Sequence, residues 1–435
     1  MRICIIGGGT AGWMTATTLR LLEDCEITLI ESPNIPISGV GESTLQSIQK
    51  WVEFVGIKED ELRFLKETNA TLKHSIKFTN WVRKDSGSYH YPFGYRNHAR
   101  HPNALGLLAE RGKVDINEMY AYHFDALKFG EFLRKNYCQD VNHIIEEVDE
   151  SIVDTFDADL FVDCTGFNSL LLGKRLKEPY ISYDHLIPND SAWATHLPHV
   201  DKEKMCPYTE CTAINNGWVW KIPLWDSVGT GYVYSSKHIS HEDAKQEFID
   251  HIGTDDCEFK HISMKCGRYE RTWVDNVVAI GNSGGFLEPL ESNGILFIHD
   301  NLLKLYRTLR RGKPSRLLRD MYNKGTNLFF DEFAQFIAVH YSFTAREDTP
   351  YWKDVFERGY NLENTDVYGL GYYAKELYAY GDFGFANKGF SYIATGMEVT
   401  PYLDKVEHDY SVYDDIIDKQ PSLYTYMKEE IHGYR

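Results

Sequence analysis

The first 32 residues show a strand, a helix and a second strand in their pattern of apolar and polar positions. Residues 2–9 (RICIIGGG) are a short apolar run that ends in glycines. Residues 11–22 (AGWMTATTLRLL) have the spacing of a helix, and residues 25–32 (CEITLIES) are a second β-rich run. The three segments together predict a βαβ unit.

The next hundred residues alternate between turn-rich and periodic segments. Residues 32–48 are rich in Pro, Gly and Ser and predict a connection, which two helices follow to about residue 70. Residues 69–81 alternate like a strand. Residues 117–137 have the spacing of one long helix.

The middle of the chain predicts further strands. Residues 140–166 indicate a hairpin, and the continuous apolar run in 158–167 (ADLFVDCTGF) suits a strand buried on both faces. Residues 208–236 predict a meander, because NNG and DSVGTG are turn signals between alternating runs. Residues 276–281 (NVVAIG) predict another buried parallel strand.

The last third of the chain is predicted to be mainly helical and is rich in tyrosine. Residues 295–311 have helical spacing, and Gly312 closes that helix. The sequence contains no internal repeat and no flexible linker, so we expect the domains to be interleaved.

The charge balance argues against a nucleic-acid partner. The chain has 64 Asp and Glu against 46 Lys and Arg, which gives a formal net charge of −18. A surface this negative repels phosphate backbones, so we expect no nucleic-acid partner. Solubility is the simpler meaning of the charge.

The cysteines indicate a reducing compartment. Eight cysteines form no CxxC pair, and several lie in apolar runs such as RICIIG and FVDCTG. They are typical of reduced core residues, and their spacing fits no zinc pattern, so we expect no metal. With no charged leader and no run of about 18 apolar residues, the chain is expected to be cytoplasmic, without a membrane anchor.

A G-x-G-x-x-G motif lies between the first strand and the first helix. Glycines in this context allow a tight turn and a close approach of the backbone to a pyrophosphate, whose charge meets the positive end of the helix. Glu31 ends the second strand about 20 residues later, where a carboxylate can accept hydrogen bonds from a ribose. The motif therefore predicts a dinucleotide site. The residues assigned to its turn are Gly7, Gly9, Thr10, Ala11 and Gly12.

Two later strand-to-glycine elements, in residues 158–167 and 276–291, favour FAD over NAD. A chain that returns twice to one dinucleotide resembles the FAD-binding oxidoreductases, in many of which the last strand ends in Gly-Asp. Here Asn282 follows Gly281, and its amide can still hydrogen-bond a hydroxyl of the ribityl chain. We expect an α/β fold, with an FAD-binding Rossmann-like scaffold, an inserted β-sheet and a largely helical C-terminal region.

Four segments resemble, in order, segments of the flavin-dependent tryptophan halogenase family. Residues 340–352 (HYSFTAREDTPYW) also look like a family segment, so the likeness covers roughly the first 350 residues. The glycine motif is shared by very many proteins, whereas W-x-W-x-I-P is close to diagnostic among flavoproteins. The four segments are GGGTAGW (7–13), GVGEST (39–44), GWVWKIP (217–223) and GFLEPLESNGI (285–295).

This resemblance implies an enzyme that halogenates an electron-rich aromatic substrate. In the family, reduced FAD and oxygen convert halide to hypohalous acid, which travels through an internal tunnel to a separate substrate pocket. FAD and a halide (chloride, bromide or iodide) are thus expected, with the reduced flavin supplied by a separate NAD(P)H-dependent flavin reductase. Whether the enzyme forms a homodimer is left open. The cofactor contacts that the resemblance adds are Gly41, Glu42, Ser43 and Ile298.

The resemblance also implies a division of the chain at residue 340. Residues 1–340 would form the FAD-binding, monooxygenase-like core with an interleaved substrate-facing sheet. Residues 341–435 would form a helical region that covers the substrate pocket.

Trp218 and Trp220 lie two residues apart in a predicted strand, so their side chains face the same side. Pro223 fixes the exit of the strand. Packing of a core would explain the pattern alone, but the neighbouring family segments favour a partition between flavin and substrate. Such a partition keeps the substrate from the flavin and lets a small oxidant pass.

Lys73 and Glu291 match the catalytic positions of the family. An ammonium at Lys73 can donate a hydrogen bond to hypohalous acid, or the free amine can form a haloamine. Strand alternation places Lys73, Ser75 and Lys77 on one face, so only the resemblance selects Lys73. Glu291 matches the acidic residue that would orient the electrophile and take the ring proton, whereas Glu288 is interpreted as structural.

The halide site implied by the resemblance is the backbone around Asn293 and Gly294. These residues precede a predicted helix, so unpaired amides and the positive end of the helix converge on an anion. The family usually has Ser-Thr-Gly where this chain has Ser292, Asn293 and Gly294. We therefore expect a halide preference that differs from strict chloride use.

Residues 88–94 (SYHYPFG) resemble a substrate-facing segment in which His usually precedes Pro-Phe directly. Tyr91 intervenes here, so either His90 or Tyr91 could enter the pocket, and Phe93 would stack on a flat ring. We could not match the C-terminal residues that hold the head group of a free amino acid, which leaves indoles and phenols as open as tryptophan.

Two alternatives belong to other classes of protein. A flavin-dependent monooxygenase that hydroxylates its substrate directly predicts oxygenated product without halide. A flavoprotein that serves as a redox sensor or scaffold predicts slow flavin turnover with no product.

Overall fold

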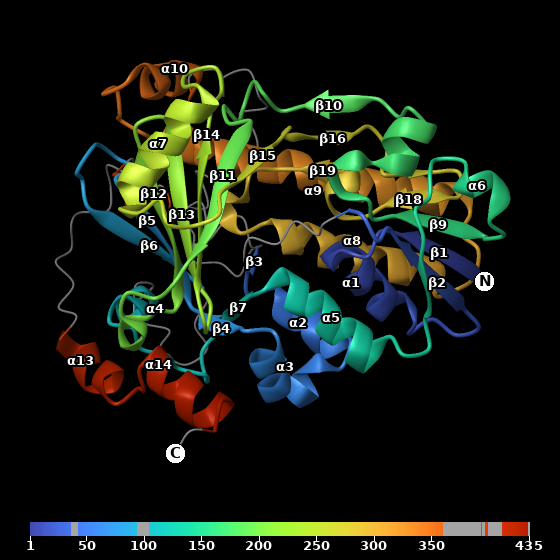
Figure 1. Ribbon diagram of the computed structural model, residues 1–435, viewed down its shortest axis with the longest axis horizontal. Coiled ribbons are helices and arrows are strands. Elements are labelled where there is room, and N and C mark those ends of the chain that lie inside the picture. Colours follow the sequence, from blue (N-terminus) through green and yellow to red (C-terminus); the bar gives the residue numbers. More distant parts are fainter. Residues whose placement is uncertain (36–41, 94–103, 360–392, 394–395, 399–410, 434–435) are drawn as a thin grey trace. The chain divides into compact units, whose positions relative to one another are not determined.

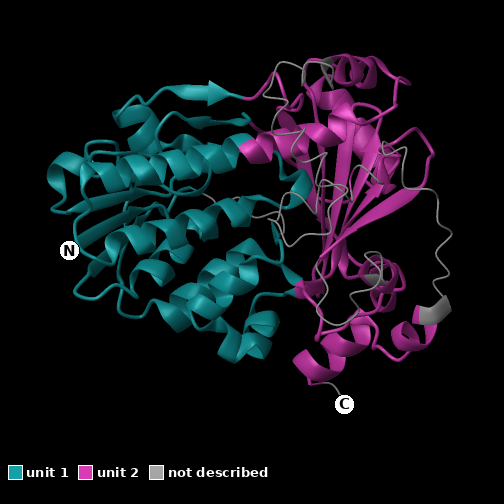
Figure 2. Cartoon of the chain, turned by 180° about the vertical axis from the view of Figure 1, so that it is seen from behind, with its two compact units in different colours: residues 1–70, 121–182, 265–331 teal, residues 71–120, 183–264, 332–435 magenta. Residues whose placement is uncertain are grey.

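The computed structural model describes residues 1–35, 42–93, 104–359, 393, 396–398 and 411–433. The chain divides into two compact units, and each unit is assembled from three segments (Figure 2). The predicted boundary between residues 340 and 341 falls inside helix α9 (Arg316–Ser342), and that division stays a prediction. Unit 1 consists of Met1–Ala70, Ala121–Ser182 and Lys265–Asp331, and unit 2 consists of Thr71–Tyr120, Tyr183–Met264 and Glu332–Arg435.

A six-stranded sheet lies at the centre of unit 1, in the order β17, β18, β9, β1, β2, β8 (Figure 1). All neighbouring strands are parallel except β17 and β18, so the predicted α/β class is confirmed. Strand β9 is buried at every position, as its continuous apolar run predicts. The strands are β1 (Arg2–Ile6), β2 (Glu26–Glu31), β8 (Asn142–Ile145), β9 (Leu160–Asp163), β17 (Trp273–Val274) and β18 (Val277–Ala279).

Helices and short strands complete unit 1. Helix α1 packs against α5 and α8, and the rings of Phe297 on α8 and Phe330 on α9 stack with centroids 4.2 Å apart. The helices are α1 (Thr10–Leu19), α2 (Ile48–Phe54), α3 (Glu61–Glu67), α5 (Ala126–Tyr137), α6 (Ile152–Thr155), α8 (Gly294–Leu309) and the first part of α9. The short strands are β3 (Glu42–Ser43), β7 (Ala121–Phe124), β10 (Tyr180–Ser182), β16 (Gly267–Tyr269) and β19 (Gly285–Phe286).

Two predicted elements of unit 1 are wrong. The single helix over 117–137 is instead strand β7 followed by α5, because the Asp125 carboxylate caps the amides of Leu127 and Lys128 and starts the helix there. The hairpin over 140–166 is also absent, since β8 pairs in parallel with β2 and α6 follows it. A local cap thus decides where α5 begins, whereas a partner that is distant in sequence decides the pairing of β8.

A seven-stranded sheet forms the centre of unit 2, in the order β15, β11, β14, β13, β12, β5, β6 (Figure 1). The predicted meander is confirmed, because β12, β13 and β14 are antiparallel neighbours. Only the pair of β12 and β5 is parallel in this sheet. The strands are β5 (Ser75–Thr79), β6 (Ser88–Pro92), β11 (Ser191–Leu197), β12 (Tyr208–Ile214), β13 (Gly217–Pro223), β14 (Val228–Tyr234) and β15 (Lys260–Ser263).

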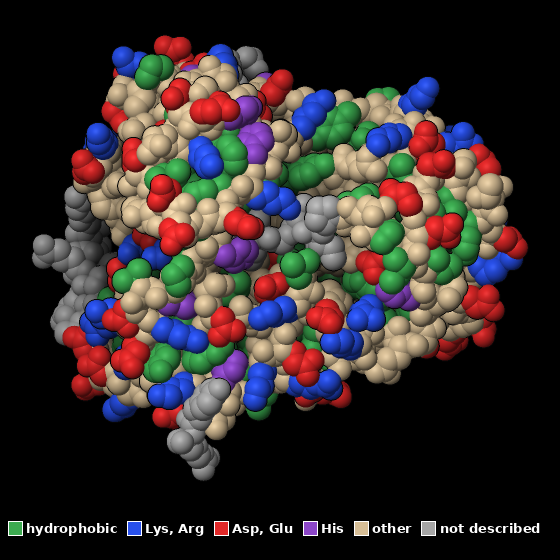
Figure 3. Space-filling view, in the orientation of Figure 1, with side chains coloured by type: hydrophobic (Ala, Val, Ile, Leu, Met, Phe, Trp, Pro, Cys, Tyr) green, Lys and Arg blue, Asp and Glu red, His purple; other side chains and the backbone are tan. Residues whose placement is uncertain are grey.

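Helix α7 (His241–Ile252) covers part of this sheet, where Phe248 packs with Val219, Tyr232 and Tyr234. None of the helices in the described ranges is both long and apolar enough to cross a membrane. Acidic and basic side chains are interspersed over the face shown in Figure 3. The other elements of unit 2 are β4 (Thr71–Lys73), α4 (Ala104–Glu110), α10 (Pro350–Gly359), α13 (Ser411–Asp418) and α14 (Leu423–Tyr426).

Candidate active site

The turn between β1 and α1 in unit 1 has no room for side chains at its glycines. Gly7 has a φ of 111°, and a Cβ there would lie 2.4 Å from the carbonyl oxygen of Cys164. A Cβ on Gly12 would lie 1.9 Å from the carbonyl oxygen of Gly7. Helix α1 begins after Gly9 without a capping side chain, so its first amides have no side-chain acceptor. This glycine cradle fits the pyrophosphate of a dinucleotide such as FAD.

Glu31 lies directly behind the glycine turn. Its Oε1 accepts a hydrogen bond from Nε2 of His143 at 2.6 Å, and a Cβ on Gly8 would lie 1.5 Å from its Oε2. The His143 ring in turn makes an edge contact with Trp13, with centroids 5.1 Å apart. The carboxylate is therefore held at the end of β2, where a ribose contact is predicted.

A second glycine brings three predicted cofactor residues together. Gly281 has a φ of 74°, and a Cβ there would lie 3.1 Å from Cβ of Ala11 and 3.5 Å from Cγ1 of Ile298. Asn282 follows Gly281 in a short 3₁₀ turn, and its side chain is exposed. Thr10, the first residue of α1, is half-buried. The first helix, the 281–283 turn and α8 thus meet at one place in unit 1.

The segment at residues 42–43 is tied to the turn before α8. Glu42 and Ser43 form β3, which pairs with β7, and Oγ of Ser292 donates a hydrogen bond to Oγ of Ser43 at 3.0 Å. Burial raises the pKa of Glu42 to about 7. Gly41, the third residue predicted in this segment, lies outside the described residues.

The start of α8 has the features of a small anion site. Ser292 has a φ of 56°, and the next residue, Asn293, has no exposed surface and does not cap the helix. The Asn293 amide donates to the carbonyl of Leu287 at 3.3 Å, while its Oδ1 receives no hydrogen bond from the described residues. A Cβ on Gly294 would meet no atom within 4 Å, so open space lies beside the first turn. Uncapped amides beside open space fit a halide.

The two glutamates before α8 are both fully buried. Glu291 ends a 3₁₀ turn, Pro289–Glu291, and directly precedes the strained Ser292. Glu288 precedes that turn. Burial alone therefore does not distinguish Glu291, the predicted base, from Glu288.

Lys73 is the last residue of β4 in unit 2, and none of its side chain is exposed. Its Nζ lies 5.2 Å from the ring centroid of Phe93, which is within range of a cation–π interaction. Lys77 on β5 instead pairs with Oε1 of Glu110 at 2.9 Å. Burial thus separates two lysines that the alternating pattern treats alike.

Trp218 and Trp220 are adjacent on β13, as the two-residue spacing predicts. Their ring centroids lie 6.2 Å apart, and both indole N–H groups are buried without an acceptor among the described residues. Trp220 lies across Gly231 of β14, where a Cβ would approach its ring to 2.2 Å. Thr230 fixes the same strand, because its Oγ1 donates to the Trp220 carbonyl at 2.7 Å.

His90 joins a polar chain in unit 2. Oγ of Ser75 lies 2.9 Å from its Nδ1, and Oε2 of Glu110 lies 2.8 Å from its Nε2. The neighbouring residues Tyr91 and Phe93 are 3% and 1% exposed, and their rings meet edge to face at 6.4 Å. The two candidates for the substrate pocket thus differ in their contacts. His90 is hydrogen-bonded to Ser75 and Glu110, whereas Tyr91 lies beside Phe93.

His74 is a buried polar residue that the sequence did not indicate. Its Nδ1 donates to the carbonyl of Met119 at 3.1 Å, and its Nε2 accepts from the amide of Asp115 at 3.2 Å. Burial lowers the pKa of His74 to about 4, so the ring is neutral near pH 7. A single His between Lys73 and Ser75 in an alternating run carries no pattern that would mark it.

Comparisons with known proteins agree with these features. Residues 2–107 and 108–409 match the family profile described as tryptophan halogenase. The tryptophan 6-halogenase SttH of Streptomyces toxytricini is 35% identical over 429 residues, which cover 82% of this chain and 81% of SttH. The tryptophan 7-halogenase RebH of Lentzea aerocolonigenes is 35% identical over 416 residues, which cover 81% of this chain and 78% of RebH.

Solved structures show the same likeness. The structure of VirX1 without ligand has a TM-score of 0.88 and 32% identity, and the alignment covers 99% of each chain. The crystal structure of SttH has a TM-score of 0.84 and 31% identity, over 98% of this chain and 99% of SttH. The chain therefore belongs to the tryptophan halogenase family of flavin-dependent enzymes.

Proposed function

We propose that this enzyme halogenates an electron-rich aromatic ring by way of hypohalous acid. In the balanced reaction, the arene, a halide, oxygen, reduced FAD and one proton give the aryl halide, oxidised FAD and two waters. A ring C–H bond breaks and a carbon–halogen bond forms. FAD, when bound in unit 1, supplies with oxygen the oxidising power for the halide, and a separate NAD(P)H-dependent flavin reductase supplies its reduced form.

The residues of unit 1 would hold the cofactor and the halide. The glycine cradle at Gly7 and Gly12 accepts the pyrophosphate, and the Glu31 carboxylate accepts from a ribose hydroxyl. The uncapped amides at Asn293 and Gly294 hold the halide, because a helix start attracts an anion and the space beside Gly294 admits one.

Lys73 of unit 2 would activate the electrophile. Its ammonium donates a hydrogen bond to the oxygen of hypohalous acid, which draws electron density from the halogen, and the oxygen leaves as water. The observation that carries the proposal is the complete burial of this lysine beside Phe93 in a chain of the halogenase family. Because water is excluded around this side chain, a hydrogen bond from its ammonium to a bound oxidant would be stronger than in bulk water. Glu291 would take the ring proton and restore aromaticity.

Trp218 and Trp220 would separate the flavin from the substrate. Both rings lie on one strand with their centroids 6.2 Å apart, so the carbon faces of the two indoles can form a continuous, largely apolar surface. An apolar wall of this kind gives hypohalous acid few groups to hydrogen-bond, although indole itself can be halogenated. The relatives SttH and RebH are named for tryptophan, so tryptophan is the first substrate to test. Indoles, phenols and pyrroles follow.

The experiment compares Lys73→Met with Lys77→Met as the matched control. Each variant is supplied with a flavin reductase, FAD, NADH, oxygen and either bromide or chloride, and products are read by mass spectrometry. We expect Lys73→Met to lose halogenated product by more than a hundredfold while its NADH consumption is unchanged. Lys77→Met removes a lysine of the next strand, β5, that pairs with Glu110, and it should keep most of the product.

Three results would contradict the proposal. Hydroxylated product formed without halide would identify a direct monooxygenase. Halogenated product that persists in Lys73→Met would remove the lysine from the mechanism. Oxidised flavin with no product from any ring or halide would favour the redox sensor.

A further inference from the structure

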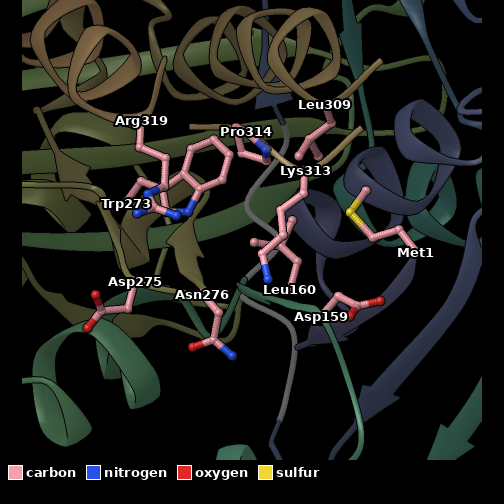
Figure 4. Close-up of a pocket in the computed structure, with 10 residues that line it drawn as sticks. All are labelled: Met1, Asp159, Leu160, Trp273, Asp275, Asn276, Leu309, Lys313, Pro314 and Arg319. Carbon is pink, nitrogen blue, oxygen red and sulfur yellow. The ribbon is translucent and has the colours of Figure 1, made fainter. Parts of the chain in front are cut away.

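A pocket of about 410 Å³ lies in unit 1 at the edge of the six-stranded sheet where its parallel strands begin (Figure 4). Leu160 at the start of β9 and Asn276 just before β18 line it, together with Leu309 at the end of α8. The glycine turns follow the opposite, carboxyl ends of β1 and β18. A strand of five residues spans roughly 16 Å, so this pocket is separate from the cofactor cradle.

Two cations line the pocket. Neither Lys313 nor Arg319 lies within 4.0 Å of a carboxylate oxygen among the residues that the structure describes. The hydrogen bond from the Arg2 amide lowers the pKa of Asp159, and the Lys313 charge adds to this effect. Lys313 and Arg319 both belong to residues 307–324, which contain seven Lys or Arg and one Asp in a chain of net charge −18. Figure 4 shows the Arg319 side chain beside the Trp273 indole. Lys313 and Arg319 can each donate a charged hydrogen bond to an anionic group that enters the pocket.

Trp273 gives a second and independent sign of a ligand. The residue is 3% exposed and lines the pocket, yet its indole N–H finds no acceptor among the described residues. A buried donor without a partner costs about 1–3 kcal/mol, and an acceptor atom on a ligand would remove that cost. The ring, with Leu160 and Leu309, also supplies an apolar wall for a flat molecule.

Two carboxylates limit the charge of the ligand. Asp159 and Asp275 lie on opposite sides of the pocket in Figure 4. The Asp159 carboxylate already accepts from the backbone amide of Arg2 at 2.8 Å. The two carboxylates balance the two cations, so the pocket repels the multiple charges of a nucleotide phosphate, and at most one anionic group fits between Lys313 and Arg319.

We infer that this pocket is a second small-molecule site, which binds an aromatic monocarboxylate. The carboxylate lies between Lys313 and Arg319, one of its oxygens accepts from the Trp273 indole, and the ring packs on the apolar wall. The volume is within the range of ligand pockets and suits a molecule of one or two rings. This inference is independent of the proposed halogenation.

The test follows Trp273 directly. The full chain is labelled with 5-fluorotryptophan, its nine tryptophan signals are recorded by ¹⁹F NMR, and Trp273→Phe identifies the signal of residue 273. Indole-3-acetate is titrated as the probe, with 3-methylindole as the neutral analogue and inorganic phosphate as the anion without a ring. We expect a saturable shift of the Trp273 signal with indole-3-acetate alone.

Two variants on helix α9 then test the role of the Arg319 charge. Arg319→Gln should weaken binding about tenfold, because a charged hydrogen bond is lost. Arg316→Gln is the matched control, since its side chain is 89% exposed and does not line the pocket, and it should bind like the parent. Unchanged positions of the other eight signals report that each variant is folded.

Three results would overturn the inference. The first is a Trp273 signal that does not move at millimolar indole-3-acetate. The second is an equal response to phosphate or to 3-methylindole, which would exclude an aromatic carboxylate. The third is equal affinity in Arg319→Gln and Arg316→Gln.

Discussion

Glu110 is expected to hold the edge of the unit 2 sheet through His90 and Lys77. A hydrogen bond from His90, followed by the nearby Lys77 ammonium, lowers the pKa of Glu110 from 4.5 to about 2. A shift of that size corresponds to about 3 kcal/mol at most. Because the Glu110 side chain is 45% exposed, screening by solvent reduces the expected contribution to about 1–2 kcal/mol. Glu110→Gln removes the charge and should cost that amount.

The assay is hydrogen exchange of the β6 amides, because it reports the stability of one strand and not only that of the whole chain. A loss of about 1–2 kcal/mol at pH 7 accelerates their exchange roughly 5- to 30-fold. The folded pKa of Glu110 is depressed, so its contribution is present above about pH 4.5 and is lost as the pH falls toward about 2. The difference between parent and variant should therefore be constant from pH 7 to pH 5 and shrink below pH 4.5.

Glu131→Gln is the matched control. Glu131 pairs with Lys135 one turn away on α5 at 2.6 Å, both side chains are more than half exposed, and such pairs contribute about 0.3–0.5 kcal/mol. Its loss should leave the β6 amides unchanged. Protection of β6 in Glu110→Gln within twofold of the control would refute the reasoning.

Three further predictions concern the wall, the halide turn and the buried histidine. Gly231→Ala places a Cβ 2.2 Å from the Trp220 ring, so we expect a loss of about 1–3 kcal/mol in thermal denaturation. We also expect less halogenated product per NADH consumed. An unchanged product yield would argue against the partition. Asn293→Thr should shift turnover from bromide toward chloride in paired assays, and an unchanged ratio would remove residue 293 from halide choice. The folded pKa of His74 is lowered to about 4, so the unfolded chain binds the proton first and stability falls as the pH drops from about 6.5 toward 4. His74→Gln should flatten that fall in urea titrations. An equal fall in parent and variant would contradict this role of His74.

Unit 1 is largely predictable from the sequence because its main motif is local. The G-x-G-x-x-G turn needs only a strand, a glycine with positive φ at Gly7 and a helix, and all three are neighbours in the chain. The buried strands β9 and β18 follow from continuous apolar runs. Residues Ala11 and Ile298 meet around Gly281 because parallel strands end at one edge of the sheet.

The structure of unit 2 depends on contacts between residues distant in sequence, which the pattern does not contain. Lys73 and Lys77 have the same place in an alternating run, yet one is fully buried and the other pairs with Glu110 from a distant helix. The run itself is interrupted at His74, where β4 ends and β5 begins. Burial of a lysine is decided by tertiary packing, so periodicity alone cannot identify it.

The interleaving of the two units has a consequence for how the protein is made. Strand β1 pairs with β9, and β9 pairs with β18, so the sheet of unit 1 stays incomplete until the ribosome has passed Ala279. A nascent chain that stops earlier exposes the open edge of β9, which is a template for aggregation. Neither unit can be cut out as one continuous fragment, and chains that end before Val277 should be recovered as insoluble protein.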